Sequence, residues 1–356
     1  MAIPNFRYSP LPGDVVFGAG ELENVGEHLA RRGYKRALVL STPEQRDQAE
    51  RVARLLGSAA AGIHDRAVMH VPVEVAREAI AKASSLNVDC IVGIGGGSTI
   101  GLGKAIALES STHVIAIPTT YAGSEMTPIY GLTDAGLKKT GRDIRVLPKL
   151  VIYDPLLTAT LPRGLTVTSG INAIAHAVEG LYATDGNPVL SLMAEEGIRA
   201  IAAALPKIIV NVNDLNARAE CLYGAWLCGA VLGATSAALH HKLCHTLGGT
   251  FNLPHAETHT VVLPHAVAYN SPATPDAMRR VSRALGGGDP AVGLYELAKK
   301  CGAALALKDL GMPHEGIEVA AKLALANPYA NPREITLDGV RHLLTMAWEG
   351  KSPAAG

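Results

Sequence analysis

Histidines gather in one short stretch of this sequence. Of the thirteen in the chain, six fall in a single segment: His240, His241, His245, His255, His259 and His265. A seventh, His176, stands in the segment SGINAIAHAVEG, four residues after Asn172. Imidazole binds metals, transfers protons and polarises carbonyl groups near neutral pH. We therefore expect the chemistry of this chain to lie at these histidines.

The spacing of the histidines predicts which of them meet. His241 and His245 are four residues apart in a segment with helical spacing, so both should project from one face of one helix. Gly248 and Gly249 are expected to end that helix. His255 then follows after a loop and can turn back beside the pair. These three imidazoles are predicted to share one site.

A second pair, Asn172 and His176, has the same four-residue spacing and is expected to supply the opposite wall of the site. An amide oxygen is a weak, neutral ligand, whereas a carboxylate brings a full negative charge. A divalent metal should therefore bind loosely here or be dispensable. The remaining members of the group are expected to have ordinary structural roles: His240, His259 and His265.

Charge and cysteine content exclude several classes of function. The 32 basic and 32 acidic residues cancel, so no broad basic surface is available for nucleic acid or an acidic membrane. No segment reaches the roughly twenty apolar residues of a membrane-spanning helix, and the first residues lack the pattern of a secretion signal. The five cysteines are well separated and form no CxxC motif, which is typical of reduced cytosolic thiols. We expect a cytoplasmic protein that acts on a small molecule.

The pattern of the sequence changes near residue 155, and this predicts two domains, 1–155 and 156–356. In the first, short apolar runs such as RALVLSTP, VDCIVGIGGGS and THVIAIPTT alternate with helical patterns. That alternation indicates a Rossmann-like parallel sheet covered by helices. In the second, alanine- and leucine-rich helical patterns dominate. The expected fold is an α/β nucleotide-binding domain followed by an all-helical catalytic domain, with the active site in the cleft between them.

Two loops of the first domain have a composition that suits a nucleotide. A strand over 89–94 runs into GGGS, and a helix is expected over 100–108. Glycines let backbone amides approach a phosphate, and the start of a helix favours an anion. The loop IPTTYAGSE also follows a buried strand, where open parallel sheets bind ligands. The strict GxGxxG spacing is absent, and ordinary turns and caps are the alternative explanation.

Taken together, these segments resemble the group III, iron-dependent-type alcohol dehydrogenase family, which shares its two-domain plan with dehydroquinate synthase and glycerol dehydrogenase. The resemblance spans nearly the whole chain and lies in FGAG, GGGSTIGLGKAIA, IPTTYAGSE, YDP, GINAIAHAVEG, HHKLCHTLGG and PHAETH. It implies a homodimer and NADH or NADPH as coenzyme. The coenzyme-binding positions that it implies are Gly96, Gly97, Ser98, Thr119, Thr120, Ser124 and Lys139.

The resemblance also implies roles for the histidines. The positions that bind metal in the family are occupied here by Asn172, His176, His241 and His255. His245 would stand beside the nicotinamide and the substrate and handle a proton. Three departures mark the chain: Asn172 replaces Asp, Gly101 replaces an acidic residue, and the PTT loop is one residue shorter. They resemble a subgroup that reduces keto-dicarboxylates in the bacterial breakdown of aromatic compounds.

Reducing a carbon–carbon double bond conjugated to a ketone does not require a metal. Hydride adds to the far alkene carbon, and an imidazole N–H can stabilise the enolate that forms. We therefore expect an NAD(P)H-dependent reductase of a small dicarboxylate that needs no divalent metal. His245 or His241 would stabilise the enolate and protonate the α-carbon, while His176 and His255 would shape the pocket or bind a carboxylate.

Two groups of residues are expected to determine how the chain binds the charged groups of its substrate and coenzyme. Lys139, Arg142 and Arg145 lie in a predicted loop and are candidates for binding the substrate carboxylates, although solvated loop charges are an equal alternative. After the second strand, Ser41 and Thr42 stand where an acidic side chain usually binds the ribose. NADPH should therefore be accepted alongside NADH.

Three other functions are compatible with parts of the sequence. A metal-dependent alcohol or polyol dehydrogenase would use water to complete the site that Asn172 weakens. A non-redox synthase or sugar-phosphate lyase of the same fold would consume no coenzyme. A binding or metal-storage protein would leave the two nucleotide-type loops unexplained.

Overall fold

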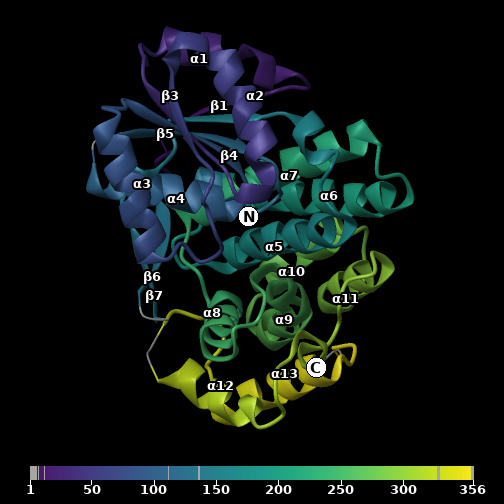
Figure 1. Cartoon of the computed structure of the whole chain (residues 1–356). Helices are drawn as coiled ribbons and strands as arrows, with labels where there is room; N and C mark the ends of the chain where they lie inside the picture. The colour runs from purple at the N-terminus through teal and green to yellow at the C-terminus, as the bar shows by residue number, and fades with distance from the viewer. Residues whose placement is uncertain are drawn as a thin grey trace. The chain divides into compact units, whose positions relative to one another are not determined.

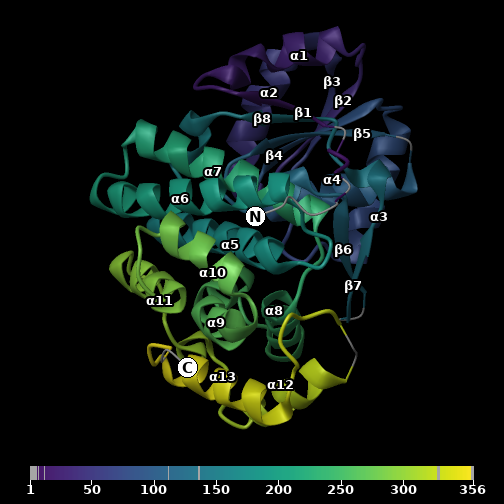
Figure 2. The same ribbon diagram turned by 180° about the vertical axis from the view of Figure 1, so that it is seen from behind.

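The computed structural model describes residues 6, 8–11, 13–110, 112–134, 137–326 and 329–353. Two compact units make up the chain (Figures 1 and 2). One covers Leu11–Leu161, and the other contains the helices that follow from Pro162 onward.

The first unit is built on a six-stranded parallel sheet with the strand order β1-β8-β5-β4-β2-β3. Its strands are β1 (Asp14–Phe17), β2 (Ala37–Leu40), β3 (Ala60–His64), β4 (Cys90–Gly95), β5 (His113–Pro118) and β8 (Leu150–Tyr153). Every residue of β2, β4 and β8 is buried. Strands covered on both faces carry continuous apolar runs, and this is why the sequence predicted β2 and β4 correctly.

Helices cover both faces of this sheet (Figure 1). They are α1 (Val25–Arg31), α2 (Arg46–Leu56), α3 (Val73–Ser85) and α4 (Gly97–Glu109). Helices α1 and α2 pack with Val39 and Val92 in one apolar core, whereas α3 and α4 pack with Leu38 and Ile91 in another. Neighbouring residues of a strand point to opposite faces, so one run of sequence serves two cores. The predicted α/β architecture is confirmed.

A hairpin of β6 (Ile129–Asp134) and β7 (Leu137–Arg142) lies outside the main sheet. The prediction of a loop around Lys139 and Arg142 is therefore wrong, because both residues belong to β7. Charged and glycine residues hide the alternation that would identify a strand. Arg145 follows in a short 3-10 helix, where its guanidinium bonds the Asp143 carboxylate and the Leu108 carbonyl. The guanidinium of Arg145 therefore already has hydrogen-bond partners within its own unit.

The second unit contains helices and no strand among its described residues, as predicted. Its helices are α5 (Arg163–Tyr182), α6 (Pro188–Val210), α7 (Leu215–Ala234), α8 (Leu239–Phe251), α9 (His255–Asn270), α10 (Pro275–Ala284), α11 (Pro290–Lys300), α12 (Gly316–Leu325) and α13 (Leu337–Glu349). Side chains cap several of them. Asn187 accepts from two amides at the start of α6, and Asp214 accepts from Ala217 N at the start of α7.

Helices α6 and α7 approach each other through glycines. A Cβ atom on Gly197 would lie 2.7 Å from Cys228 Sγ and 3.1 Å from the Gly224 carbonyl oxygen. Only a residue without a side chain permits this approach. The close contact matters for function because α5, which carries Asn172 and His176, packs against both helices.

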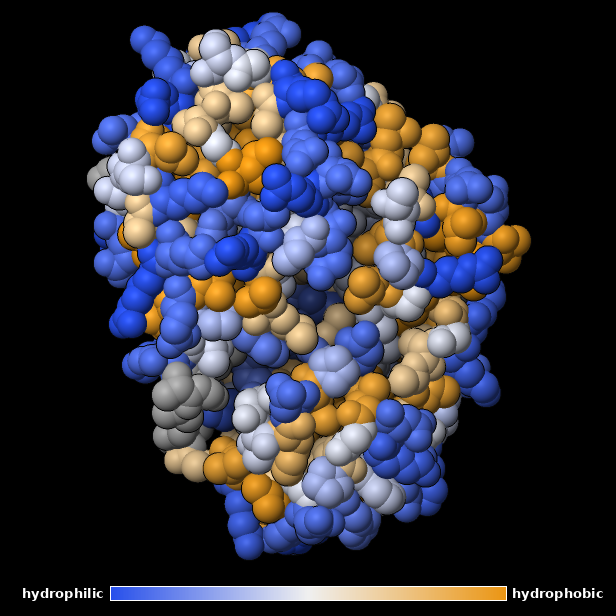
Figure 3. All heavy atoms as spheres, viewed as in Figure 1, coloured by the Kyte–Doolittle hydropathy of each residue, from blue (hydrophilic) through white to orange (hydrophobic). Residues whose placement is uncertain are grey.

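No single helix among the described residues is long and apolar enough to cross a membrane. The bent pair α7 and α8, which meet at 94°, reaches that length and composition only when the two are taken together. On the face drawn in Figure 3, hydrophilic side chains predominate and hydrophobic ones lie among them in small groups.

We expect Gly197→Ala to lower the free energy of unfolding by about 1–3 kcal/mol, because the added methyl group overpacks the α6–α7 contact. Urea denaturation followed by circular dichroism measures this loss. Gly164→Ala is the matched control, since a Cβ atom there has no neighbour within 4 Å; its stability should be unchanged or up to about 1 kcal/mol higher. Equal losses in both variants would contradict the packing argument.

Candidate active site

The glycine turn joins β4 to α4 in a conformation that needs glycine. Gly95 has a φ of 153°, and a Cβ atom there would lie 2.4 Å from Thr99 Oγ1. Helix α4 begins at Gly97, three residues earlier than predicted, and its N-cap Gly96 offers no side-chain hydrogen bond. A Cβ atom on Gly97 would meet nothing within 4 Å. The first amides of α4 therefore border open space, which suits a phosphate group.

The loop after β5 lies against this turn. Thr119 N donates to the Gly95 carbonyl oxygen at 3.1 Å, and Gln45 Nε2 donates to Thr119 Oγ1 at 3.0 Å. A Cβ atom on Gly96 would lie 3.0 Å from Thr120 Cγ2. The structure thus brings the glycine turn and the first threonines of the second loop together, at the carboxyl ends of neighbouring parallel strands.

A buried lysine, which the sequence reasoning did not select, holds the rest of the second loop. Lys104 lies inside α4, and its Nζ donates to the Ser124 carbonyl at 2.6 Å, to Thr127 Oγ1 at 3.0 Å and to the Ile129 carbonyl at 2.8 Å. Burial lowers the pKa of Lys104 to about 7, while the nearby Glu125 carboxylate acts in the opposite direction. A single charge in the apolar helix GLGKAIAL was the available signal. Lys104 fixes the backbone that presents Ser124.

Lys139 lies on the hairpin strand β7. Its side chain is 73% exposed, and its Nζ is 3.6 Å from Asp134 Oδ2.

Gly101, which the sequence marked as a departure from the family, faces Val71: a Cβ atom there would lie 2.9 Å from Val71 Cγ2. The position has no room for a longer side chain unless Val71 moves.

Three helices of the second unit carry the candidate catalytic histidines. Asn172 and His176 are buried on α5, and α9 begins at His255. Helix α8 carries His241 and His245. It continues through Gly248 and Gly249 to Phe251, so the prediction that the glycines end it is wrong. Buried leucines on both sides of the glycines pack into the core and sustain the helix.

The rings of these histidines form one cluster. Those of His176 and His241 are stacked with centroids 5.1 Å apart. The His245 ring lies 6.3 Å from both His241 and His255. His245 is exposed, His255 is half-buried and the other two are buried. The structure therefore brings together the four histidines that the sequence selected.

Two more histidines, for which we expected ordinary structural roles, belong to the same cluster. The His240 Nε2 and His259 Nδ1 atoms lie 2.9 Å apart, a hydrogen bond in which one ring donates to the other. The His259 ring is 4.3 Å from that of His255 and 5.0 Å from that of His241. Both residues are fully buried. By contrast, His265 is on α9 about 9 Å along the axis from His259, and burial lowers its pKa to about 4.

Burial keeps much of this cluster neutral. It lowers the pKa of His176, His240 and His259 well below the ordinary value of 6.5, and neighbouring imidazoles act in the same direction. Neutral rings offer one N–H donor and one bare nitrogen each. The cluster can therefore exchange protons and hydrogen bonds without a large positive charge.

Glu179 completes the site, and the sequence reasoning missed it. Its Oε2 atom lies 2.6 Å from His241 Nδ1 and accepts from Ala238 N at 2.8 Å, while Oε1 accepts from His240 N at 2.8 Å. The carboxylate is 2% exposed. A signal was present in GINAIAHAVEG, where Glu179 follows Asn172 by seven residues and so shares its helix face.

The donor atoms of the site can be compared with the needs of a metal. Asn172 Oδ1, His176 Nδ1 and His241 Nε2 are buried and have no hydrogen-bond partner among the described residues. These amide and imidazole atoms are of the types that bind iron or zinc. They carry no formal charge, and the Glu179 carboxylate is already engaged by three donors. The set fits a divalent ion, but one held without a charged ligand.

A second group has ligand atoms within 4.8 Å of one another, namely His240, Cys244 and His259. Its two imidazoles already hydrogen-bond to each other, and burial raises the pKa of the Cys244 thiol well above its ordinary value. The hydrogen bond occupies one nitrogen of each ring, while His240 Nδ1 and His259 Nε2 are buried without a partner among the described residues.

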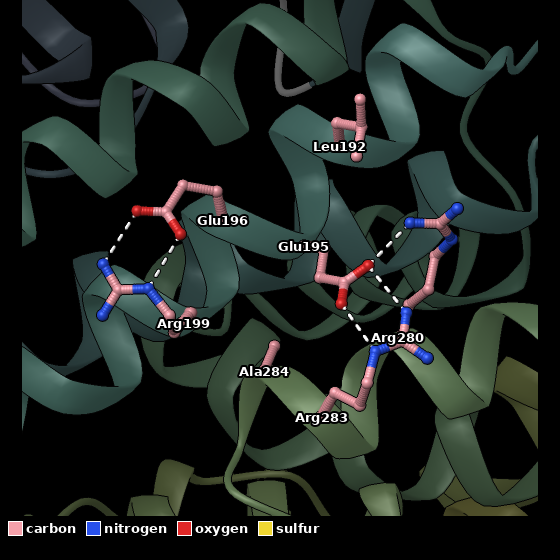
Figure 4. A pocket seen from close by; sticks show the side chains of 7 residues that line it. All are labelled: Leu192, Glu195, Glu196, Arg199, Arg280, Arg283 and Ala284. Atoms are coloured by element: carbon pink, nitrogen blue, oxygen red, sulfur yellow. Dashed lines mark hydrogen bonds and ion pairs between the residues drawn. The ribbon is translucent and has the colours of Figure 1, made fainter.

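A surface pocket of about 420 Å³ lies on α6 and α10 and contains three arginines (Figure 4). Carboxylates match them: Glu195 binds Arg280 and Arg283, and Glu196 binds Arg199. Because these charges are paired, the pocket does not have the free cations that a dicarboxylate needs.

Comparison with known proteins places this geometry in a family. The model of the iron-containing alcohol dehydrogenase matches residues 12–155, and that of the C-terminal part of the family matches residues 166–348. The chain belongs to the iron-containing alcohol dehydrogenase family and is an oxidoreductase.

Within that family, the chain is similar over nearly its whole length to maleylacetate reductases. It is 63% identical to the maleylacetate reductase of Burkholderia cepacia, with 96% of this chain and 97% of the relative covered. Identity to that of Sphingobium indicum is 60%, with 98% and 99% covered. The crystal structure of maleylacetate reductase from Agrobacterium tumefaciens superposes with a TM-score of 0.96 at 50% identity, and the match covers 99% of this chain and 100% of that one.

We expect Lys104→Met to raise the Kd for NADH about tenfold, a loss of about 1.4 kcal/mol, because the Ser124 and Ile129 carbonyls lose their buried donor. The free energy of unfolding should fall by about 1–3 kcal/mol. Calorimetric titration and urea denaturation measure the two effects. Lys139→Met is the comparison: an exposed lysine changes stability by less than about 0.5 kcal/mol, so a raised Kd there would reveal direct contact with the coenzyme. Unchanged NADH affinity in Lys104→Met would contradict the positioning role.

Proposed function

We propose that the chain catalyses the NAD(P)H-dependent reduction of the carbon–carbon double bond of maleylacetate, giving 3-oxoadipate in the bacterial degradation of aromatic compounds. The observation that carries the proposal is similarity to maleylacetate reductases at 50–63% identity over almost the full chain. The buried histidine cluster supplies groups that suit this reaction.

In the proposed reaction, the reduced nicotinamide gives hydride to the alkene carbon far from the ketone. The electron pair of the double bond moves toward the ketone oxygen, which becomes an enolate. An N–H of His245 or His241 stabilises that oxygen. A proton then reaches the α-carbon, so one C–H bond forms from hydride and the other from an acid group of the site.

The coenzyme site of this proposal is the start of α4. A Cβ atom on Gly97 would meet nothing within 4 Å, and the helix dipole at the start of α4 favours the pyrophosphate. Ser41 and Thr42 follow β2 and bring no carboxylate that would repel a 2′-phosphate. The proposal therefore includes both NADH and NADPH as donors.

We also propose that activity does not require a metal. If one binds, Asn172, His176, His241 and His255 would hold it, and it would act as a Lewis acid on a carbonyl or alkoxide oxygen. The unpartnered donor atoms of Asn172, His176 and His241 favour the second candidate function, a metal-dependent alcohol dehydrogenase. The proposal also includes a cytoplasmic homodimer.

The reaction and its metal independence can be tested together. We expect protein treated with a chelator and then gel-filtered to oxidise NADH and NADPH rapidly when maleylacetate is added, with one 3-oxoadipate formed per coenzyme. Absorbance of the reduced nicotinamide and chromatography of the product measure this. Activity that vanishes after chelation and returns with Fe²⁺ or Zn²⁺ would favour the metal-dependent alternative. A strict NADH requirement would contradict the coenzyme proposal alone.

We expect His245→Ala to lower kcat by about 10²–10⁴-fold, the usual contribution of a proton-handling group, while the Kd for NADH stays within a factor of two. Stopped-flow turnover and calorimetry measure these quantities. Thr250→Ala, an exposed position on the same helix, is the control and should have normal kcat. Normal turnover in His245→Ala would remove this residue from the mechanism.

A further inference from the structure

We infer that Glu179 is a positioning residue for the reaction: it holds the Nδ1–H of His241, so that this imidazole exchanges protons only at Nε2. The inference rests on the proposed function, because it gives His241 the role of a proton-handling group. It concerns a carboxylate on α5 and a histidine 62 positions later, at the start of α8.

The contact has the geometry of an oriented dyad. Glu179 Oε2 and His241 Nδ1 lie 2.6 Å apart, and the two side chains are 2% and 7% exposed. A carboxylate oxygen accepts hydrogen bonds, so Nδ1 must carry a proton. Hydrogen bonds to an ionised group are short and strong when water is excluded. The ring is therefore fixed both in tautomer and in orientation.

The two backbone contacts of Glu179 do not by themselves account for this arrangement. Its oxygens accept from Ala238 N and His240 N, which cap α8 and complement the helix dipole. Oε2 accepts from Ala238 N and from the His241 ring at once. The carboxylate thus links the beginning of α8 to the side chain that this helix carries into the cluster.

The opposite nitrogen of the ring is the one left for chemistry. His241 Nε2 is buried and has no hydrogen-bond partner among the described residues. The ring is stacked on that of His176 at 5.1 Å, which restricts its rotation. In the proposed reaction His241 takes part as the imidazolium, protonated at both nitrogens, and its Nε2–H bond breaks as the C–H bond forms at the α-carbon. The electron pair stays on Nε2, and the ring becomes the neutral tautomer protonated at Nδ1, which is the form that Glu179 stabilises.

The structure offers a control for the capping role. Asp185 anchors the same segment just before α8, because its carboxylate accepts from Ser236 N at 2.9 Å and from Ser236 Oγ at 2.5 Å. Asp185 is exposed and belongs to no part of the proposed mechanism. Asp185→Asn therefore loosens the start of α8 and leaves the dyad intact.

The experiment compares Glu179→Gln, Glu179→Asp and Asp185→Asn with the unaltered chain. We expect Glu179→Gln to lower kcat for maleylacetate about 10- to 100-fold, as loss of an orienting group does elsewhere, with KM and the Kd for NADH within about threefold. The ¹⁵N resonances of the His241 ring, assigned with His241→Asn, should show a protonated Nδ1 in the unaltered chain and a mixture of tautomers in Glu179→Gln. Asp185→Asn should lower Tm and leave kcat and the ring signals unchanged.

Other outcomes separate the possibilities. A Glu179→Gln variant with a lower Tm, normal kcat and an unchanged Nδ1 signal would reduce Glu179 to a helix cap and overturn the inference. If Glu179→Gln does not fold, Glu179→Asp decides: its shorter carboxylate should retain a protonated Nδ1 with intermediate kcat, and full activity without that signal would contradict the dyad. Absence of maleylacetate turnover in the unaltered chain would instead refute the proposed function, while the ring signals would still test the contact.

Discussion

The arrangement of the helical unit depends on one buried carboxylate. Transfer of an ionised group from water costs several kcal/mol unless its oxygens are fully bonded, and Glu179 has three donors within 2.8 Å. All three belong to residues 238–241, so the carboxylate joins α5 to the first turn of α8. Any slip of α8 along its axis would leave this charge unsatisfied. The position of His241, and of His245 one turn later, is thereby set from α5.

This constraint explains how so many polar groups persist inside an apolar bundle. Most of α5 is buried, and α6, α7 and α9 pack around it. Burial keeps His176, His240 and His259 neutral, so they cost less than charged rings would. His240 and His259 hydrogen-bond to each other through one nitrogen each, and five other polar atoms of the cluster have no partner among the described residues: Asn172 Oδ1, His176 Nδ1, His240 Nδ1, His241 Nε2 and His259 Nε2. Buried polar atoms without partners are uncommon in folded proteins. Several such atoms lie together in this cluster, and a bound ligand would supply the hydrogen-bond or metal partners that they lack.

The sequence predicted the parts of this molecule that depend on local pattern. Strands buried on both faces are continuous apolar runs, and the four-residue spacing of Asn172 with His176 and of His241 with His245 describes a helix face directly. It did not predict the partners of buried charges, because Glu179 and Lys104 bond atoms 20 to 62 positions away and a single charge in an apolar helix does not say what it meets. The extent of α8 was also missed, since tertiary packing outweighs the low helix propensity of two glycines. The contact between His240 and His259 could not be predicted for the same reason, because only the fold places α8 against the start of α9.

The presence of Asn172 in place of a carboxylate can be explained by the charge of Glu179. A second carboxylate on the same helix face, seven residues away, would place two like charges in one dry site, and a bound cation would be needed to offset them. With Asn172 the site has a single negative group, and that group already matches the donors of α8 and His241. Such a balance suits a reaction in which charge develops briefly on a ketone oxygen and is neutralised by a proton. In the proposed reduction, an oriented imidazolium supplies that proton from Nε2 while its other nitrogen remains bonded to the carboxylate. A proton from solvent then restores the ring, so the site ends the cycle with the same net charge that it had at the start.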